Sequence, residues 1–192
     1  MAGKAERSEE TRARILASAG RGFRRLGYGG LGIDGLAKDA GVTSGAFYAH
    51  FKGKAEAFRA AMVAGMGDLR EGIATMRAEG PDWPRALTDL YLTSRRTGPI
   101  DEACALQNLT SEVARGDEAL RAAFEAELLA VLNSASDGKG GRDEAIALLS
   151  LLIGGVSMAR AVADPALSDA IAAAVRQAAE DMIARKAENR GG

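Results

Sequence analysis

The fourteen-residue segment from Gly41 to Lys54 constrains the fold of this chain most strongly; it reads GVTSGAFYAHFKGK. Gly41 can adopt the left-handed backbone of a tight turn between two helices, and Thr43 offers a side-chain oxygen that caps the helix after it. On that helix Phe47 and Phe51 are four residues apart, so both can pack inward. A turn, a capped short helix and polar side chains in this order are typical of a helix-turn-helix.

The outward face of this short helix is small and polar, which suits a surface that approaches nucleic acid. Tyr48, His50 and Lys54 carry side chains that can hold the phosphate backbone of DNA. The residues that we expect nearest the bases are Thr43, Ser44, Gly45 and Ala49. Because their side chains are short, sequence preference would depend on close approach and DNA shape as well as on polar contacts.

The pattern extends on both sides of the segment. Between Thr11 and Met62 the chain contains, in this order, Ile15-Leu16, Gly27-Tyr28, Leu36-Ala37 and then Gly41 through Lys54. In residue type and spacing this run resembles the DNA-binding domain of the TetR family of transcriptional regulators. The resemblance covers roughly the first third of the chain. It implies an all-α protein that binds a palindromic DNA operator as a homodimer.

Two positions depart from the family pattern. Ala49 stands where the family often carries a larger polar residue, and Gly32 stands where a Thr or Ser cap is frequent. The second helix of the domain is therefore expected to lack a side-chain cap. Asp34, in the first turn of that helix, compensates in part through the helix dipole.

Charge is divided unevenly along the chain. Residues 1–60 contain eleven Lys and Arg against six Asp and Glu, and residues 61–192 contain fourteen against twenty, although the net charge is only −1. A basic segment joined to an acidic body is expected when one part of a protein meets phosphates. We therefore predict a DNA-binding domain over residues 1–53 and an effector-binding and dimerisation domain over residues 54–192.

Composition and periodicity predict an all-α fold of about nine helices. Hydrophobic residues make up 47% of the chain but aromatic residues only 5%, and β-branched runs are few. Apolar spacing and Gly or Pro breaks place helices near 12–26, 33–40, 44–51, 53–78, 83–96, 101–114, 117–132, 142–163 and 165–186. The first three form the helix-turn-helix domain, and the fourth joins it to the body.

Several other classes of protein receive no support. Residues 1–14 lack the apolar core of a secretory signal, and the nearly uncharged stretch 145–159 is shorter than the roughly 20 residues of a membrane helix. A single cysteine excludes an intrachain disulfide and fits a reducing cytoplasm. With one histidine and one cysteine, we expect no metal site, no cofactor and no enzyme activity.

The last two helices carry apolar stripes with small residues among them. Either these stripes belong to the core of one chain, or they meet their copy across a two-fold axis in the four-helix interface that the TetR resemblance implies. The candidate interface residues are Leu149, Leu152, Ile153, Val156, Ile171, Val175 and Met182. A dimer also suits a short recognition helix, because two half-sites are then bound together.

The resemblance implies a pocket for an unknown small-molecule effector in each subunit. Candidate lining residues, which fit an ordinary core equally well, are Met62, Met66, Trp83, Leu87, Tyr91, Cys104, Leu109, Val113 and Phe124. Few charged residues share these stripes, which favours an uncharged or amphipathic ligand. Cys104 is either an inert packed thiol or, near a helix N-terminus, a reactive one.

Two functions of different classes remain open. In the first, the chain is a ligand-responsive repressor that binds double-stranded DNA. In the second, it is a helical dimer that binds a hydrophobic small molecule or a protein partner, with a DNA-binding domain degraded by the glycines at positions 29, 30, 32 and 35. Salt-dependent DNA binding with a sequence preference distinguishes the first from the second.

Overall fold

A computed structural model describes residues 2–136 and 141–190, with the side chains of residues 3–136 and 141–185. Over these ranges the chain forms nine α-helices, a π-helical segment and a 3₁₀ turn, and contains no strand. The all-α fold class predicted from the sequence is confirmed. The contacts divide the chain into a first unit, residues 1–66 with 100–126, and a second unit, residues 67–99 with 127–192.

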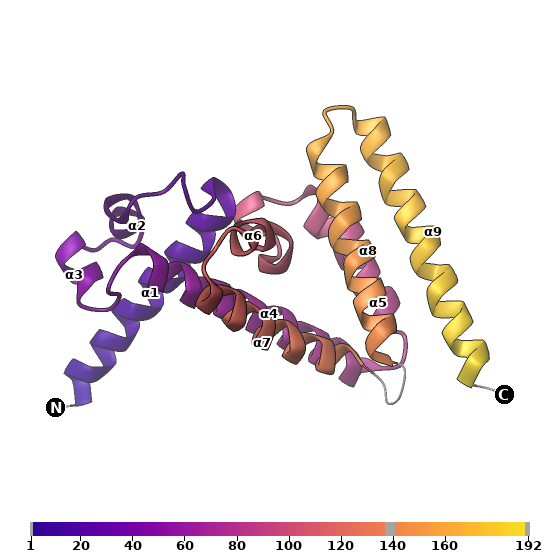
Figure 1. Ribbon diagram of the computed structural model, residues 1–192, viewed down its shortest axis with the longest axis horizontal. Helices are drawn as coiled ribbons and strands as arrows, with labels where there is room; N and C mark the ends of the chain where they lie inside the picture. The colour runs from indigo at the N-terminus through magenta and orange to yellow at the C-terminus, as the bar shows by residue number, and fades with distance from the viewer. Residues whose placement is uncertain (1, 137–140, 191–192) are drawn as a thin grey trace. The chain divides into compact units, whose positions relative to one another are not determined.

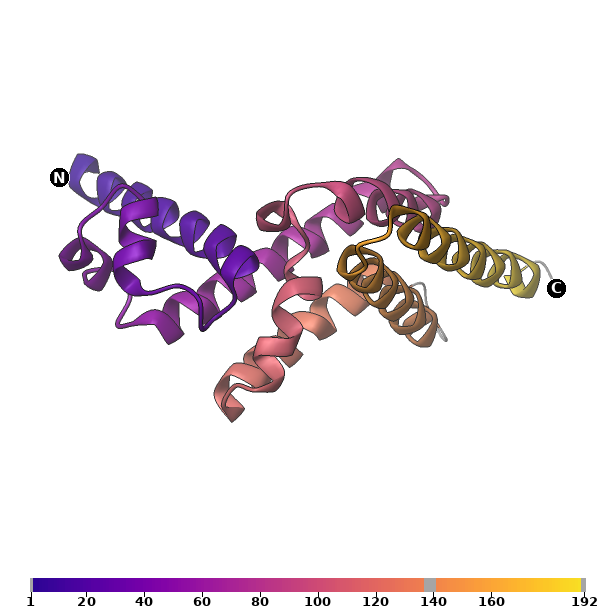
Figure 2. The same ribbon diagram turned by 90° about the horizontal axis from the view of Figure 1, so that it is seen from above.

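The first unit is built around the helix-turn-helix. It contains α1 (Ala2–Leu26), α2 (Ile33–Asp39), α3 (Ser44–Tyr48), the start of α4 (Lys54–Glu79), a 3₁₀ turn (Ile100–Glu102), α6 (Ala105–Ala114) and the start of α7 (Glu118–Ala135). In Figures 1 and 2, α1, α2 and α3 lie together. α1 begins earlier than the sequence predicts. The prediction missed its first turns because residues 3–10 are exposed and carry no apolar stripe that could mark a helix.

Phenylalanine side chains dominate the core of the first unit. Phe23, Phe47, Phe51 and Phe58 are at most 1% exposed. The rings of Phe23 and Phe58 meet edge to face with their centroids 5.1 Å apart, and those of Phe47 and Phe51 lie 5.7 Å apart. The inward packing of Phe47 and Phe51 that their spacing predicts is confirmed.

The second unit is a layer of longer helices. It contains the end of α4, α5 (Trp83–Leu90), a π-helical segment (Tyr91–Arg95), the end of α7, α8 (Gly141–Ala161) and α9 (Pro165–Arg190). α8 and α9 run side by side in opposite directions (Figure 1). At Gly155 an added Cβ atom would collide with the side chain of Val175, so the close helix approach suggested by the small residues of α8 is confirmed there.

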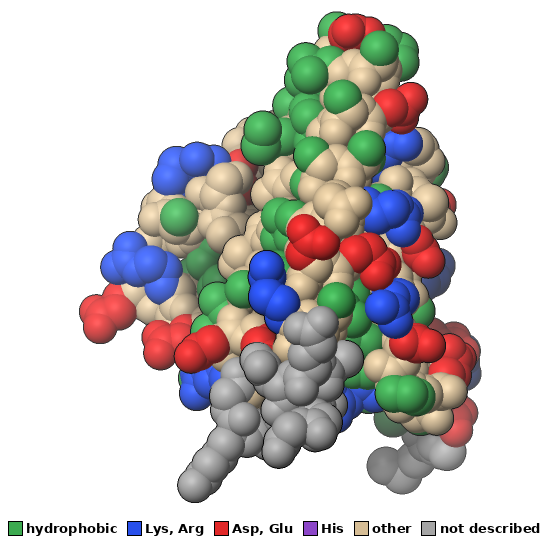
Figure 3. All heavy atoms as spheres, turned by 90° about the vertical axis from the view of Figure 1, so that its right-hand side faces the viewer, with side chains coloured by type: hydrophobic (Ala, Val, Ile, Leu, Met, Phe, Trp, Pro, Cys, Tyr) green, Lys and Arg blue, Asp and Glu red, His purple; other side chains and the backbone are tan. Residues whose placement is uncertain are grey.

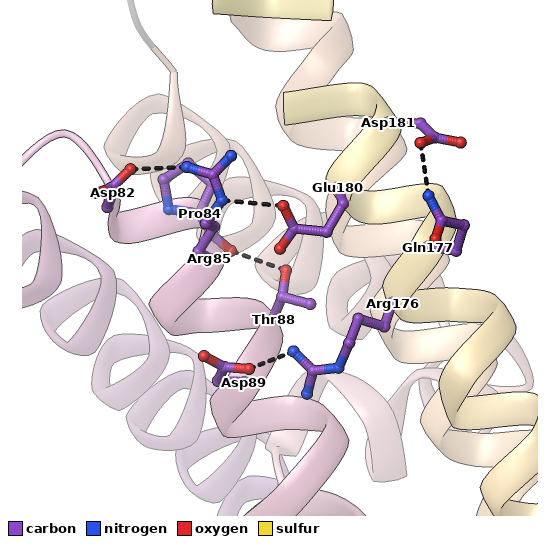
Figure 4. Close-up of polar contacts among 9 residues, drawn as sticks. All are labelled: Asp82, Pro84, Arg85, Thr88, Asp89, Arg176, Gln177, Glu180 and Asp181. Carbon is purple, nitrogen blue, oxygen red and sulfur yellow. Dashed lines mark hydrogen bonds and ion pairs between the residues drawn. The ribbon is translucent and has the colours of Figure 1, made fainter. Parts of the chain in front are cut away.

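Ion pairs join α5 to α9, as Figure 4 shows. Arg85 donates to Glu180 at 2.9 Å and to Asp82 at 2.9 Å, and Arg176 pairs with Asp89. The hydrogen bond to Glu180 and the negative charge of that carboxylate raise the pKa of Arg85. These pairs lie at the surface, so they orient the two helices more than they stabilise the unit.

Two helices that the sequence predicts as continuous are interrupted. The helix over 83–96 changes from α to π at Tyr91, whose side chain is buried, and Arg160 of α8 donates to the carbonyl oxygens of residues 95, 96 and 98 at 2.7, 3.1 and 3.0 Å. The helix over 101–114 is broken at Cys104, whose extended backbone (φ −62°, ψ 134°) makes it the N-cap of α6. The apolar spacing along the sequence reveals neither break.

α8 is the described helix that is long and apolar enough to span a membrane, a test that core helices of globular proteins also pass. In this protein 39% of the most apolar window of α8 is buried. Leu149, Leu152 and Val156 pack inside the chain, whereas Ile146 and Met158 are exposed. An uncharged face of α8 is therefore left open.

Candidate DNA-binding surface

The turn between α2 and α3 has the geometry that the sequence predicts. Gly41 has a φ of 68°, in the left-handed region that favours glycine. The N–H of Val42 donates to the carbonyl oxygen of Ala37 at 2.9 Å, which closes the end of α2. Thr43 then caps α3, because its Oγ1 accepts a hydrogen bond from the N–H of Ala46 at 3.1 Å.

α3 turns one face to the core and the other to solvent. Phe47 is fully buried, whereas its neighbour Tyr48 is 56% exposed. The residues predicted nearest the bases lie on the outer side: Thr43, Gly45 and Ala49 are exposed and Ser44 is half-buried. His50, which follows the helix, is half-buried as well. The result is a surface of short side chains beside one exposed phenol, which can enter a groove of DNA closely.

A carboxylate joins the starts of α2 and α3. Ser44 donates a hydrogen bond from its hydroxyl to Asp34 at 2.6 Å. The N-cap of α2, Gly32, makes no side-chain cap hydrogen bond, as the sequence predicts. Asp34 therefore has a second role, orienting Ser44, which only the folded chain reveals. The hydroxyl oxygen of Ser44 can still accept a hydrogen bond from a base or a phosphate-bound water.

Lys54 opens α4 and lies against an aromatic ring. Its ammonium nitrogen is 4.5 Å from the centroid of the Tyr28 ring. The N–H of Tyr28 donates to the carboxylate of Glu112, on α6, at 3.3 Å. The sequence does not identify Tyr28 or Glu112 as site residues, because the contacts join segments that are far apart along the chain.

A second cation lies beside the end of the helix-turn-helix. The guanidinium carbon of Arg12, on α1, is 5.2 Å from the centroid of the Phe51 ring. Lys52, which follows Phe51, is exposed. The sequence shows arginines all around α1 without indicating which of them approaches the recognition helix. The contact with Phe51 places Arg12 beside the segment that follows α3.

The nine residues predicted to line an effector pocket divide between the two units. The first unit holds Met62, Met66, Cys104, Leu109, Val113 and Phe124, and the second holds Trp83, Leu87 and Tyr91. All are buried except Phe124, which is half-buried. Their role in ligand binding stays a prediction.

One of these residues, Trp83, lines a cavity of about 370 Å³ within the second unit. The cavity lies between α5, α7, α8 and α9, with apolar walls that include Leu148, Met182 and Ile183. Asp143, Glu144 and Arg185 also line it. Its volume falls within the range of small-molecule sites. Met182, which the sequence suggests for a dimer interface, also lines this cavity, and its place at an interface stays a prediction.

The start of α6 holds two polar groups in an apolar setting. Cys104 is the N-cap residue of α6 and is 7% exposed, so its expected place near a helix N-terminus is confirmed, and its reactivity stays a prediction. Gln107 has a buried Oε1 that accepts no hydrogen bond from the described residues. Because a buried acceptor without a donor is costly, a water or a bound molecule that donates to Gln107 would stabilise the unit.

The residues predicted at a dimer interface lie mostly inside one chain. Leu149, Leu152, Val156 and Val175 are buried, and Ile153, Ile171 and Met182 are half-buried. On the open side of the same two helices, Ile146, Met158 and Leu167 are 43%, 60% and 48% exposed. Figure 3 shows hydrophobic side chains gathered over the upper part of this side of the molecule and charged ones below. A second copy would meet these exposed residues first.

The described residues contain no group of His, Cys, Asp or Glu that could hold a metal ion.

Comparison with known proteins places this geometry in a family. Residues 15–61 match the model of the bacterial regulatory proteins of the tetR family. The chain is 44% identical over 55 residues to the HTH-type transcriptional regulator TtgR of Pseudomonas putida, covering 29% of this chain and 26% of TtgR. It is 43% identical over 58 residues to the regulator SrpR of Pseudomonas putida, covering 30% and 27%. The chain thus matches about a quarter of the length of these relatives.

Solved structures share the fold over a longer range. A TetR-family transcriptional regulator from Cytophaga hutchinsonii superposes with a TM-score of 0.71 at 20% identity, over 93% of this chain and 95% of that one. SCO4454, a TetR-family regulator from Streptomyces coelicolor, gives 0.72 at 22% identity, over 92% and 96%. FadR from Bacillus subtilis, in complex with stearoyl-CoA, gives 0.62 at 17% identity, over 85% and 96%. Residues 15–61 therefore carry the helix-turn-helix domain of the tetR family of bacterial regulatory proteins, and the chain shares the fold of TetR-family regulators.

Proposed function

We propose that this protein is a transcriptional repressor that binds a palindromic DNA operator as a homodimer and releases it when a small molecule binds. The geometry of α2, the turn and α3 carries the proposal: α3 is capped by Thr43, anchored by Phe47, and exposed on its small outer face. The residues that contact the bases in this proposal are Thr43, Ser44, Gly45 and Ala49. Those that contact the phosphates are Tyr48, His50 and Lys54.

The basic side chains around α3 support phosphate binding. Lys54 is the first residue of α4, and Arg12 lies over the ring of Phe51. Lys52, which lies between Phe51 and Lys54 in the sequence, is exposed. Each cation that neutralises one phosphate contributes about 0.9 to the slope of log K against log salt concentration. Several such contacts in each of two subunits would make binding strongly dependent on salt.

Selection from a random pool of duplex DNA with the purified full-length protein tests the proposal. We expect the recovered sequences to contain two inverted half-sites with centres about one or two helical turns apart, because a symmetric dimer presents two copies of α3. We also expect a log–log salt slope of several units on the recovered site. Binding without sequence preference, or no duplex binding, would instead favour a helical dimer whose DNA-binding domain is degraded.

Dimerisation through the open side of α8 and α9 follows from its exposed, uncharged residues. A Cβ atom added at Gly154 meets nothing within 4 Å, so this exposed glycine can be changed without disturbing the chain itself. A charged side chain there would be buried against the partner and left without a counter-ion. We expect Gly154→Arg to convert the dimer to folded monomer in analytical ultracentrifugation, with Ala163→Arg, in the exposed turn after α8, as the control that stays dimeric.

The cavity beside Trp83 is our candidate for the effector site. Its walls are mainly apolar, and FadR shows that a protein of this fold accommodates a ligand with a long acyl chain. Because Trp83 is the sole tryptophan of the chain, the tryptophan fluorescence comes from a residue that lines this cavity. An effector that binds in the cavity should change this fluorescence. It should also lower the affinity for DNA, and DNA should lower the affinity for the effector by the same factor.

Screening uncharged and amphipathic compounds by Trp83 fluorescence tests the assignment. Ala147, which lines the cavity and is exposed, can be changed to Phe to fill the space. We expect Ala147→Phe to remove the fluorescence response while DNA binding persists. A compound that releases DNA from the protein without any response of Trp83 would place the effector elsewhere.

A further inference from the structure

We propose that Tyr28, held in place by Glu112 of α6, positions Lys54 for its contact with a DNA phosphate. The inference rests on the proposed function, since it concerns the DNA-contacting surface of the same domain. It adds two residues, from the turn after α1 and from α6, that touch no DNA themselves and act through Lys54. Both belong to the same compact unit as Lys54.

The contact between Lys54 and Tyr28 restrains a flexible side chain. The ammonium nitrogen lies 4.5 Å from the ring centroid, within the range of a cation–π interaction. Such a contact on a partly exposed surface favours one orientation of the lysine side chain. A lysine released from the ring must lose more conformational freedom to hold a phosphate, so we expect it to make that contact in only part of the complexes, which weakens binding and lowers the number of neutralised phosphates.

The ring of Tyr28 is itself fixed by two other aromatic side chains. It meets Phe58 edge to face with centroids 5.2 Å apart, and it stacks at 6.2 Å on Phe23. Phe23 and Phe58 are each 1% exposed and contact one another. The face that Tyr28 presents to Lys54 is therefore held by the buried core of the unit.

Glu112 fixes the backbone from which Tyr28 extends. Its Oε1 accepts from the N–H of Tyr28 at 3.3 Å, and its Oε2 pairs with Arg115 at 3.2 Å. Gly27, the preceding residue, has a φ of 69°, and an added Cβ atom there would lie 2.9 Å from the Glu112 carboxylate. Glycine at this position thus permits both the turn and the approach of Glu112. A change in the position of α6 would reach Lys54 through this contact.

A double-mutant cycle on full-length protein tests the inference, with the selected operator as the ligand. We expect Lys54→Ala to weaken binding and to lower the salt slope by about 0.9 per subunit, because one phosphate contact is lost. Tyr28→Leu should lower the slope in the same direction and add no further loss to Lys54→Ala. Tyr28→Phe keeps the ring face and should bind like the wild type. A purely structural role of Tyr28 would reduce the active fraction without changing the slope.

Two matched substitutions of Glu112 test its hydrogen bond to the N–H of Tyr28. The amide side chain introduced by Glu112→Gln would still offer an oxygen to the N–H of Tyr28, whereas the methyl group left by Glu112→Ala would not. Both variants remove the ion pair with Arg115, so that loss is the same in the two. We therefore expect Glu112→Ala to lower the salt slope and Glu112→Gln to leave it unchanged. Equal slopes for the two variants would overturn the role of Glu112.

The outcomes separate the inference from the proposed function. If the wild type binds its operator and the effects of Tyr28→Leu and Lys54→Ala multiply, the inference is wrong and the proposed function stands. If the wild type shows no salt-dependent binding to duplex DNA, both fail.

Discussion

The contacts inside the first unit differ in kind from those inside the second unit. All five phenylalanines belong to the first unit, where four of them are almost fully buried around the helix-turn-helix. In the second unit, small and aliphatic residues let α8 and α9 approach closely, and ion pairs join α5 to α9. In the first unit the aromatic core anchors α3 through Phe47. In the second unit α8 and α9 pack closely against one another, and an apolar face of α8 stays exposed.

The largest effect should come from the aromatic core of the first unit. Phe47→Ala removes a fully buried ring, and such a change costs about 3–5 kcal/mol of unfolding free energy. Urea denaturation followed by circular dichroism measures the loss. Tyr48→Ala, at the adjacent exposed position, removes only the edge-to-face contact with Phe47, so it should cost about 0.5–1.5 kcal/mol and weaken DNA binding. Similar losses of stability for the two variants would contradict the described orientation of α3.

Two neighbouring glycines of α8 test the packing of the second unit. Gly155→Ala places a methyl group against Val175, and overpacking of this kind costs about 1–3 kcal/mol. Gly154→Ala meets nothing within its own chain and should stabilise the helix of the monomer by up to about 1 kcal/mol, because alanine favours the helix more than glycine does. Thermal unfolding of both variants provides the comparison. Equal shifts would show that α8 and α9 are not in close contact at Gly155.

The anchoring residues of the recognition helix give a third test. Tyr48→Phe combined with Lys54→Ala should weaken binding to all DNA sequences alike, because phosphate contacts carry no sequence information. The salt slope should fall by about 0.9 for each subunit, because only Lys54 carries a charge that neutralises a phosphate. Fluorescence anisotropy at several salt concentrations measures both quantities. A loss confined to the preferred operator would instead place Tyr48 or Lys54 at the bases.

The smallest effect should come from the surface of the second unit. Glu180→Gln removes the carboxylate that holds the pKa of Arg85 above its ordinary value. Arg85 is protonated at every pH at which the chain is folded, so the loss should not vary with pH through this arginine. We expect a slight decrease in the unfolding midpoint that disappears at about 0.5 M salt, where surface ion pairs are screened. A large decrease that persists in salt would show that α5 and α9 depend on this pair.

Local sequence was sufficient for the helix-turn-helix. Gly41, Thr43 and Phe47 each have a role set by neighbours within a few residues: a turn, a cap and an inward face. The roles of Asp34, Tyr28 and Glu112 could not be predicted in this way, because their partners lie ten or more residues away along the chain. The dimer-interface residues illustrate the same limit. Helical periodicity places Leu152 on an apolar stripe. It does not reveal whether that stripe is covered by the same chain or by a second copy.

The sequence by itself determined the all-α class, the turn at Gly41, the cap at Thr43 and the family to which the chain is related. These features depend on backbone preference and on side chains within one or two helical turns. Only the tertiary structure decided that Tyr28 supports Lys54, that Met182 lines a cavity and that one side of α8 is open. The physical reason is that such contacts depend on how helices pack, and each apolar stripe can be covered by more than one neighbour.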